Sequence, residues 1–230
     1  MSSALTRFPA DIADNLPALG GPVYWIGNIA YHLPGGSTRI TAGSAGVVFY
    51  NNTILSETSI AGASIAHWRN NLFLGEESQD MIFSVTSLAD YSSSDFNGFR
   101  PSPAAAAAFS WRSPPTAALA DITDPDYEEQ LHSIEAVSLA DYSSRTGQDR
   151  NSILVDYDIF VNVPQLSAKN IDTVQTLYDA DSLDFRLREG ASATDKGMPL
   201  LTITEGFNGD SPDLGALEYN TPMPRYGPRP

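Results

Sequence analysis

Four aromatic and basic side chains occupy places in this sequence where they could recognise a sugar. They lie in three similar segments, VYWIGNIAY, VVFYNNTIL and AHWRNNLFL, and are Tyr24, Tyr50, His67 and Arg69. Aromatic rings stack on sugar rings, and an arginine side chain binds a carboxylate through paired hydrogen bonds. These residue types indicate a polysaccharide-binding surface, although outward Tyr, His and Arg side chains are also ordinary solvated positions of a β-sheet.

Further candidate residues surround a glycine turn in the stretch YHLPGGSTRIT. If this loop folds over the same surface, a basic cluster forms in an acidic protein from Tyr31, His32, Arg39, His67 and Arg69. A polysaccharide lyase needs a base that removes the proton next to a uronate carboxyl group, and a cation that stabilises the resulting anion. One hypothesis therefore makes His67 the catalytic base, Tyr31 the acid and Arg69 the carboxylate clamp. The substrate-binding residues are then Tyr24, Tyr50, His32 and Arg39.

Acidic residues suggest two other chemistries. Asp156 and Asp158 in VDYDIF would share one face of a strand, and a glycoside hydrolase uses two carboxylates across the bond that it cleaves. Four carboxylates could hold Ca²⁺ or form a solvated loop, and these are Asp121, Asp124, Asp126 and Glu128. Calcium is the one cofactor that the sequence suggests. The sequence contains no phosphate-binding loop, no His-Glu-x-x-His motif and no Gly-x-Ser-x-Gly motif.

The charge balance restricts the partners. Among 230 residues, 28 Asp and Glu outnumber 13 Lys and Arg, which gives a formal net charge of -15. Such a surface repels phosphate backbones and anionic lipids, so we expect no nucleic-acid partner and no membrane partner. The chain has no cysteine, which excludes disulfides and thiolate metal sites and leaves the compartment open. We also expect no export signal, because no long apolar core follows a basic start near the amino terminus.

The three segments align as repeats and predict which elements position the candidate residues. The alignment places Asn28, Asn52 and Asn71 in one column, so the repeat spacings are 24 and 19 residues. Short β segments at such spacings predict a solenoid, in which each coil buries its apolar face by stacking on the next. Two columns are apolar in all three segments and should face inward: Val23, Val47 and Ala66, and Trp25, Phe49 and Trp68. The columns between them should face solvent, and they contain the four candidate residues.

The asparagines predict how each coil turns a corner. An asparagine tolerates the left-handed backbone conformation that a tight corner requires. Its side-chain amide can also bond to the equivalent amide of the next coil. We therefore expect Asn28, Asn52 and Asn71 to form an internal ladder whose role is structural.

Several later segments add motifs in a fixed order. SSSDFNGFRP contains an aspartate, aromatic, asparagine motif, and SLADYSSRTGQDRNSILVDYDIF contains a short helix, a Thr-Gly-Gln-Asp turn and a strand, with Asn151 where histidine is usual. LDFRLREGASATDKG and SPDLGALEYN follow, with Ala191, Ser192 and Thr194 at variant positions of the first. In these motifs and their order, most of residues 23–230 resembles the bacterial right-handed parallel β-helix repeat proteins of the pectin-lyase-like superfamily, specifically their carboxyl-terminal portion.

The resemblance implies a fold and a function. The implied fold is all-β: a right-handed parallel β-helix, or solenoid, with a short helical excursion and a C-terminal cap. The implied function is a carbohydrate-active protein, extracellular or periplasmic, that acts on or binds a polysaccharide, with a polysaccharide lyase as one form. The alternatives are a non-catalytic structural or binding fragment of a longer β-helix protein, and a glycoside hydrolase. Since coil sequence begins close to the amino terminus, we expect further coils or a second copy of the chain, as a homo-oligomer, to cover that end.

The organisation along the chain follows from these segments. We expect an N-terminal approach segment at 1–22 and a β-helix domain at 23–230, with coils at 23–99, a surface excursion and helix at 100–150, and final coils and the C-terminal cap at 151–230. Phe109 and Trp111 should anchor the excursion, the helix should lie at 128–144, and a strand at 152–163. Asp195 and Asp213 should hold turns through bonds from their carboxylates to the backbone.

Overall fold

The chain folds mainly as short strands in parallel sheets. The computed structural model describes residues 22–31, 37–41, 45–76, 78–114, 126–165, 179 and 182–222. Within these ranges there is one α-helix, α1 (Leu139–Thr146), and no helix is long and apolar enough to cross a membrane. The prediction of an all-β chain is confirmed at this level.

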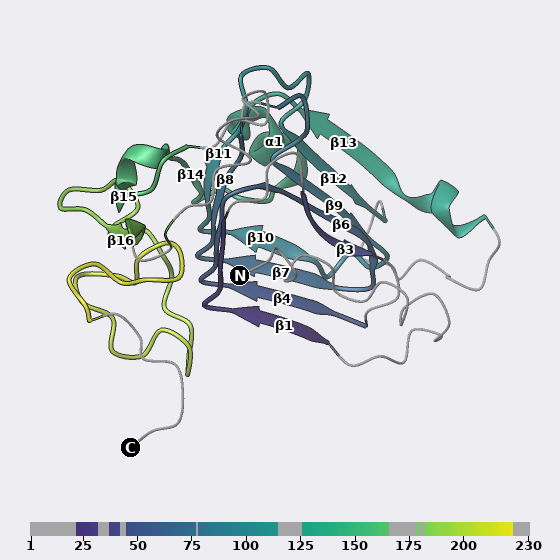
Figure 1. Cartoon of the computed structure of the whole chain (residues 1–230). Helices are drawn as coiled ribbons and strands as arrows, with labels where there is room; N and C mark the ends of the chain where they lie inside the picture. Colours follow the sequence, from purple (N-terminus) through teal and green to yellow (C-terminus); the bar gives the residue numbers. More distant parts are fainter. Residues whose placement is uncertain are drawn as a thin grey trace.

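Three sheets are built by the same cycle of strands (Figure 1). Sheet one contains β1 (Val23–Ile26), β4 (Val47–Tyr50), β7 (Ala66–Arg69) and β10 (Ser93–Asp95), in that order. Sheet two contains β2 (Ile29–Ala30), β5 (Thr53–Ile54), β8 (Leu72–Leu74), β11 (Gly98–Arg100) and β14 (Ile153–Leu154). Sheet three contains β3 (Ser37–Thr41), β6 (Glu57–Ala63), β9 (Phe83–Ser87), β12 (Phe109–Ser113) and β13 (His132–Ala136). From β1 to β9, each strand pairs in parallel with the strand three places later along the chain.

The register that the sequence predicted for sheet one is confirmed. In the first column Val23 pairs with Val47, and Val47 pairs with Ala66. The second column aligns Trp25, Phe49 and Trp68 in the same way. The side chains of that second column are buried, with exposed fractions of 6%, 0% and 0%. Their rings pack in sequence, with centroids 4.9 Å apart from Trp25 to Phe49 and 4.6 Å apart from Phe49 to Trp68. The aromatic column therefore forms the core behind sheet one.

The asparagine ladder is confirmed, and it extends further than predicted. The Asn28 Nδ2 donates to Asn52 Oδ1 at 3.2 Å, Asn52 Nδ2 donates to Asn71 Oδ1 at 2.9 Å, and Asn71 Nδ2 donates to Asn97 Oδ1 at 2.9 Å. The ladder ends on a buried carboxylate, because Asn97 Nδ2 donates to Asp149 Oδ1 at 2.9 Å.

One part of the corner prediction is wrong, namely which residue bends the chain. The left-handed conformation belongs to the residue before each ladder asparagine, and these residues are Gly27, Asn51, Asn70 and Phe96, with φ between 51° and 68°. None of the ladder asparagines has a positive φ. One residue therefore turns the corner, and the next points its amide into the ladder.

The segment after residue 100 differs from the prediction. Phe109 and Trp111 are buried, with 0% and 5% exposed, but they lie in β12 of sheet three and not on a surface excursion. The helix expected at 128–144 is wrong, because this stretch contains the 3₁₀ helix η2 (Tyr127–Gln130), then β13, and only then α1. β13 pairs antiparallel with β12 along its whole length, which holds this part of the chain extended.

Helix α1 follows β13 along the chain and packs on β12 and β13 at one end of sheet three. Ser138 caps its start by accepting a hydrogen bond from the Asp141 amide, and Gly147 ends it with a φ of 73°. The Tyr142 ring is fully buried and stacks on Phe109 with centroids 5.0 Å apart. The helix thus packs against β12 and β13, in the segment where the resemblance implied a short helix.

The predicted strand at 152–163 is interrupted. It contains β14, the 3₁₀ helix η3 (Tyr157–Ile159) and β15 (Phe160–Asn162), which pairs antiparallel with β16 (Asp184–Leu187). Asp156 caps the start of η3, so Asp156 and Asp158 do not share a strand face as predicted. The η3 turn separates them.

The C-terminal residues pack along sheet two and not over the end of the coils (Figure 1). The Gly215 amide donates to the Asn70 carbonyl at 2.7 Å, and the Ala216 amide donates to Thr53 Oγ1 at 3.0 Å. The predicted turn-holding role of the aspartates is confirmed. Asp195 accepts from the amides of Asp210 and Ser211, and Asp213 accepts from those of Asp195 and Tyr219.

Candidate functional site

The outer face of sheet one carries two rows of side chains that alternate with the buried aromatic column. One row contains Tyr24, Val48, His67 and Ser93, and the other contains Ile26, Tyr50, Arg69 and Asp95. Tyr24 and Ile26 are 65% and 40% exposed, and the later members of both rows are half-buried. Four strands therefore present a continuous surface that changes from aromatic at β1 to charged at β7 and β10.

Arg69 is held rigidly on this face. Its Nη1 donates to the Trp68 carbonyl at 2.6 Å and to the Ser93 carbonyl at 3.0 Å, and its Nη2 donates to Ser93 Oγ at 2.8 Å. These bonds use the end of the guanidinium group. Within the described part of the chain, the side edge, formed by Nε and the second hydrogen of Nη2, makes no hydrogen bond and no ion pair. This is the edge that binds a carboxylate with two parallel bonds.

His67 shares the same serine. Its Nδ1 lies 2.9 Å from Ser93 Oγ. Since arginine can only donate, Ser93 Oγ accepts from Arg69, and its own hydrogen then has His67 Nδ1 as the nearest acceptor. With Ser93 as the donor to Nδ1, the imidazole hydrogen is on Nε2. Burial and the adjacent Arg69 charge lower the pKa of His67, so the ring is neutral at neutral pH.

The carboxylate nearest to this face already has partners. Asp95 stands opposite Arg69 in the strand register, but it accepts from the backbone amide of Asn151 at 2.7 Å and from Asn151 Nδ2 at 2.8 Å. It forms no ion pair with Arg69. The positive charge of Arg69 is therefore not neutralised by any carboxylate within the described part of the chain.

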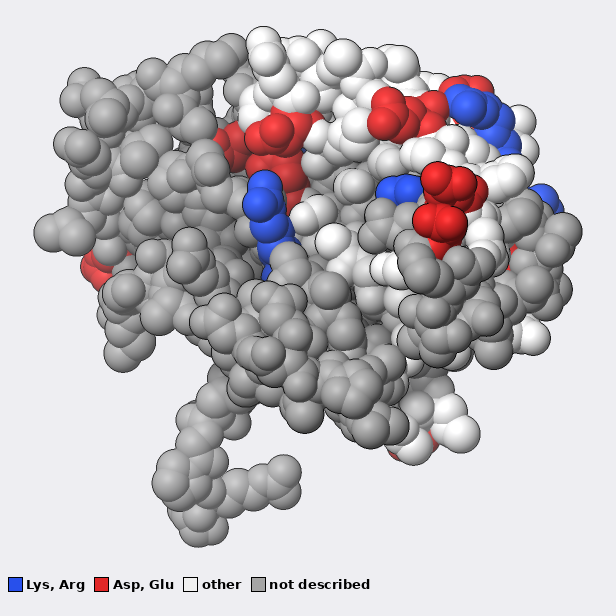
Figure 2. Space-filling model, turned by 90° about the vertical axis from the view of Figure 1, so that its right-hand side faces the viewer, with Lys and Arg blue, Asp and Glu red and all other residues white. Residues whose placement is uncertain are grey.

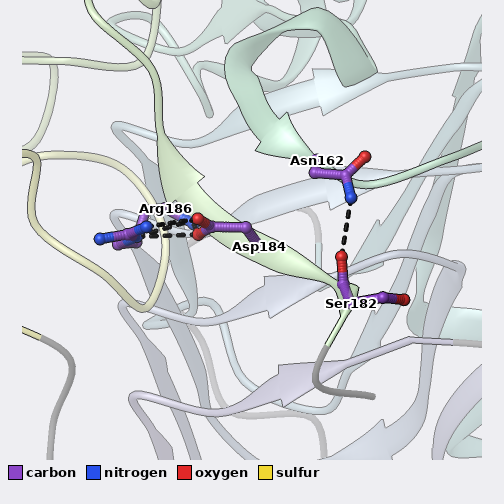
Figure 3. Close-up of polar contacts among 4 residues, drawn as sticks. All are labelled: Asn162, Ser182, Asp184 and Arg186. Atoms are coloured by element: carbon purple, nitrogen blue, oxygen red, sulfur yellow. Dashed lines mark hydrogen bonds and ion pairs between the residues drawn. The ribbon is translucent and has the colours of Figure 1, made fainter. Parts of the chain in front are cut away.

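Other arginines provide a contrast. On β16, Arg186 Nε donates to Asp184 Oδ1 at 2.9 Å, beside the bond from Asn162 Nδ2 to the Ser182 carbonyl (Figure 3). The Arg186 charge lowers the pKa of Asp184. Arg186 and Arg188 line a surface cavity of 480 Å³, and Arg188 pairs with Asp158 at 3.3 Å. Both arginines of this cavity thus have carboxylate partners.

Charge pairing is also common elsewhere on the surface. On the face shown in Figure 2, acidic groups lie beside most of the basic ones, and the coloured residues form no broad basic area. Arg100 and Arg145 follow this pattern with Asp156 and Asp141. Within the described residues Arg69 forms no ion pair, as is also the case for Arg150 and Lys196, but Arg69 alone of these three is fixed by hydrogen bonds of its side chain.

The predicted cluster around His67 is not assembled. Tyr31 follows β2 at sheet two, where its hydroxyl donates to the Pro164 carbonyl at 2.8 Å and its ring packs edge-on against Phe185. Arg39 lies on β3 in sheet three, and its side chain is exposed. His32 lies outside the described residues. Of the seven predicted site residues, sheet one brings together Tyr24, Tyr50, His67 and Arg69.

The carboxylate sites receive no structural support as metal or hydrolase centres. Asp156 and Asp158 each pair with an arginine, Arg100 at 2.8 Å and Arg188 at 3.3 Å. Asp121 and Asp124 of the predicted calcium loop lie outside the described residues. Among those that the structure does describe, no group of three or more His, Cys, Asp or Glu side chains could hold a metal ion.

Ser93 is a residue of this face that the sequence analysis missed. A signal existed, because SSDFNGF continues the alignment with Ser93 below His67 and Asn97 below Asn71. The fourth segment was harder to recognise since Ser94 replaces the aromatic residue of the inward column.

Comparison with known proteins gave no match: no family model, curated protein or solved structure is significantly similar to this chain.

Proposed function

We propose that the chain forms the successive coils of a right-handed parallel β-helix of the pectin-lyase-like kind. The support is the cycle of three strands per coil, the parallel pairing of each strand with its equivalent in the next coil, and the asparagine ladder at one corner. In such a solenoid, equivalent side chains of neighbouring coils stand about 4.8 Å apart. A flat row of this kind suits an extended polymer with repeating units.

On this framework, the outer face of sheet one binds an acidic polysaccharide. The observation that carries the proposal is Arg69, whose guanidinium is fixed by Ser93 and Trp68 while its carboxylate-binding edge has no partner among the residues that the structure describes. A uronate carboxylate is planar and fits this edge with two parallel bonds. Because the guanidinium is already immobilised, little side-chain entropy is lost on binding.

The other residues of the face have complementary roles. His67 presents its Nε2 hydrogen as a donor to a sugar hydroxyl or carboxylate. Tyr24 and Tyr50 supply rings on β1 and β4 for stacking on the neighbouring sugars. Binding therefore extends along the stack from the aromatic end to the charged end.

This geometry favours binding over elimination. A lyase would need a free imidazole nitrogen facing the substrate, whereas the only unprotonated nitrogen of His67 accepts from Ser93. The proposed acid, Tyr31, lies on sheet two and donates to a carbonyl. We therefore place the binding function first, and the lyase, the hydrolase and a purely structural module become outcomes of the test.

The test is calorimetric titration of the full chain with polygalacturonate, alginate and neutral dextran, with and without calcium. We expect binding of the acidic polymers only. Arg69→Gln should weaken it by about 10- to 100-fold, the effect of losing a charge-assisted pair of bonds. The matched control is Arg188→Gln, which removes one exposed positive charge that follows β16, outside sheet one. Equal losses in the two variants would mean that only net charge matters and would exclude a specific site at Arg69.

Parallel assays identify the chemistry. Growth of ultraviolet absorbance from unsaturated products would establish a lyase, and reducing ends without that absorbance would establish a hydrolase. Both require a catalytic arrangement that differs from the one described. No binding and no products would leave the structural module as the function.

A further inference from the structure

Ser93 occupies a special position on the proposed binding face. It is the hydroxyl of β10 that stands next to His67 in the strand register, and it is half-buried at the surface. Two contacts fix its oxygen: His67 Nδ1 at 2.9 Å and Arg69 Nη2 at 2.8 Å. A third bond, from Arg69 Nη1 to the Ser93 carbonyl at 3.0 Å, fixes the backbone of the same residue.

The two partners of Ser93 Oγ, Arg69 and His67, differ in whether they can accept a hydrogen bond. Arg69 can only donate, so it favours negative charge on the Ser93 oxygen. His67 can accept, because its Nδ1 lies 2.9 Å from Ser93 Oγ, within reach of the hydroxyl hydrogen. A hydroxyl that faces a base has the arrangement that activates a serine nucleophile, and a cation bonded to its oxygen stabilises the negative charge that develops there.

We propose that Ser93 is the nucleophile of an esterase site, with His67 as its base, and that the substrate is an O-acyl ester on an acidic polysaccharide. The choice of polymer rests on the proposed function, because the free edge of Arg69 would hold a uronate carboxylate next to Ser93. The serine chemistry itself rests only on the three side chains.

The reaction balances as an ordinary acyl transfer. Ser93 Oγ attacks the carbonyl carbon of the ester and its proton passes to His67 Nδ1, which returns it to the departing sugar oxygen as the ester bond breaks. Water then attacks the acyl group on Ser93, gives a proton to His67 and releases the carboxylic acid. His67 returns that proton to Ser93 Oγ, so the sum is ester plus water to acid plus alcohol.

The test uses a fluorophosphonate probe, which labels activated serines, together with p-nitrophenyl acetate and an O-acetylated polygalacturonate. We expect the probe to label Ser93, located by mass spectrometry of peptides, and both esters to release acetate. Ser93→Ala should abolish labelling and lower ester hydrolysis by at least about 100-fold, the usual contribution of such a group. The control is Ser133→Ala, which removes an exposed strand serine on β13. Unchanged melting curves of both variants would show that folding is intact.

The outcomes separate this proposal from the binding proposal. A wild-type chain that binds polygalacturonate but is not labelled at Ser93 would overturn the nucleophile alone. Labelling at Ser93 without binding of acidic polymers would support the nucleophile and overturn the polymer assignment. Labelling at another serine, or equal hydrolysis by wild type and Ser93→Ala, would also overturn the nucleophile.

Discussion

The asparagine ladder allows a graded prediction of stability. The Asn71 side chain is fully buried and takes part in four hydrogen bonds. Its Oδ1 accepts from the Asn52 backbone amide at 3.0 Å and from Asn52 Nδ2 at 2.9 Å. Its Nδ2 donates to the Phe49 carbonyl at 2.8 Å and to Asn97 Oδ1 at 2.9 Å. Asn71→Ala would remove all four and leave the buried Asn52 amide without its acceptor.

Asn28 is the matched control, because it has the same side chain at the exposed end of the ladder. Its Nδ2 donates to the Ile26 carbonyl and to Asn52 Oδ1, both at 3.2 Å. If it is removed, Asn52 Oδ1 still accepts from the Asn28 backbone amide at 2.9 Å. Asn28→Ala therefore leaves no buried group unpaired.

These contacts set the expected magnitudes. A buried polar group left without a partner costs about 1–3 kcal/mol, and an ordinary exposed hydrogen bond contributes about 0.5–1.5 kcal/mol. We expect Asn71→Ala to lower the free energy of unfolding by about 2–5 kcal/mol, and Asn28→Ala by about 1 kcal/mol or less. Urea unfolding followed by tryptophan fluorescence measures both, since Trp25 and Trp68 lie in the column behind sheet one. Equal losses in the two variants, or a loss below about 0.5 kcal/mol for Asn71→Ala, would refute the reasoning.

Three further predictions concern buried carboxylates and a tight contact. Burial and the charge of Asp213 raise the pKa of Glu218 from 4.5 to about 7. The folded state therefore favours the protonated carboxyl group, and the free energy of unfolding falls as pH rises from 4.5 through 7. Glu218→Gln should raise the melting temperature at pH 8 but not at pH 4. Burial also raises the pKa of Asp149 above 3.8, so Asp149→Asn should stabilise the fold at pH 7, with a gain that shrinks as pH falls toward 3.8. Gly98→Ala should lower the free energy of unfolding by about 1–3 kcal/mol in urea titrations, because the new Cβ would lie 2.7 Å from Leu72 Cδ2.

The register of sheet one could be predicted from sequence because parallel pairing imposes the same inward column on β1, β4 and β7. Trp25, Phe49 and Trp68 share a buried column, and a shift by one residue would expose all three aromatic rings. The same alignment located the ladder. It could not assign the left-handed residue, because two asparagines are adjacent in NN and either one tolerates that conformation.

The later coils were harder to predict because their strands lack the repeated pattern. β12 follows an alanine-rich stretch that has no aromatic column of its own, and β13 is held extended by antiparallel pairing and not by its sequence. The coil after β9 also replaces the inward aromatic residue with Ser94. The extended conformation of β13 therefore depends on its pairing with β12 more than on the local strand propensity of its residues.

The candidate residues of the site also include some that the sequence placed correctly and some that it placed wrongly. Tyr24, Tyr50, His67 and Arg69 were found because strand alternation alone puts them on one face. Tyr31 was assigned to that face because it lies close to it along the chain, but the corner at Gly27 directs the following residues to sheet two. Distance along the chain is a poor guide to proximity in a fold that turns a corner every few residues.

The corner that stabilises the coils also positions the proposed site. Arg69 lies two residues before Asn71, and Asp95 lies two residues before Asn97, on the strands that this pair of asparagines joins at 2.9 Å. The bonds from Arg69 to Ser93 span the same two coils. The hydrogen bond between Asn71 and Asn97 therefore helps to fix the distance between β7 and β10 close to the point where Arg69 reaches from one strand to the other. Because a ligand site gains affinity when its groups are ordered in advance, we expect the buried asparagines to contribute to the proposed recognition through the rigidity that they give to Arg69.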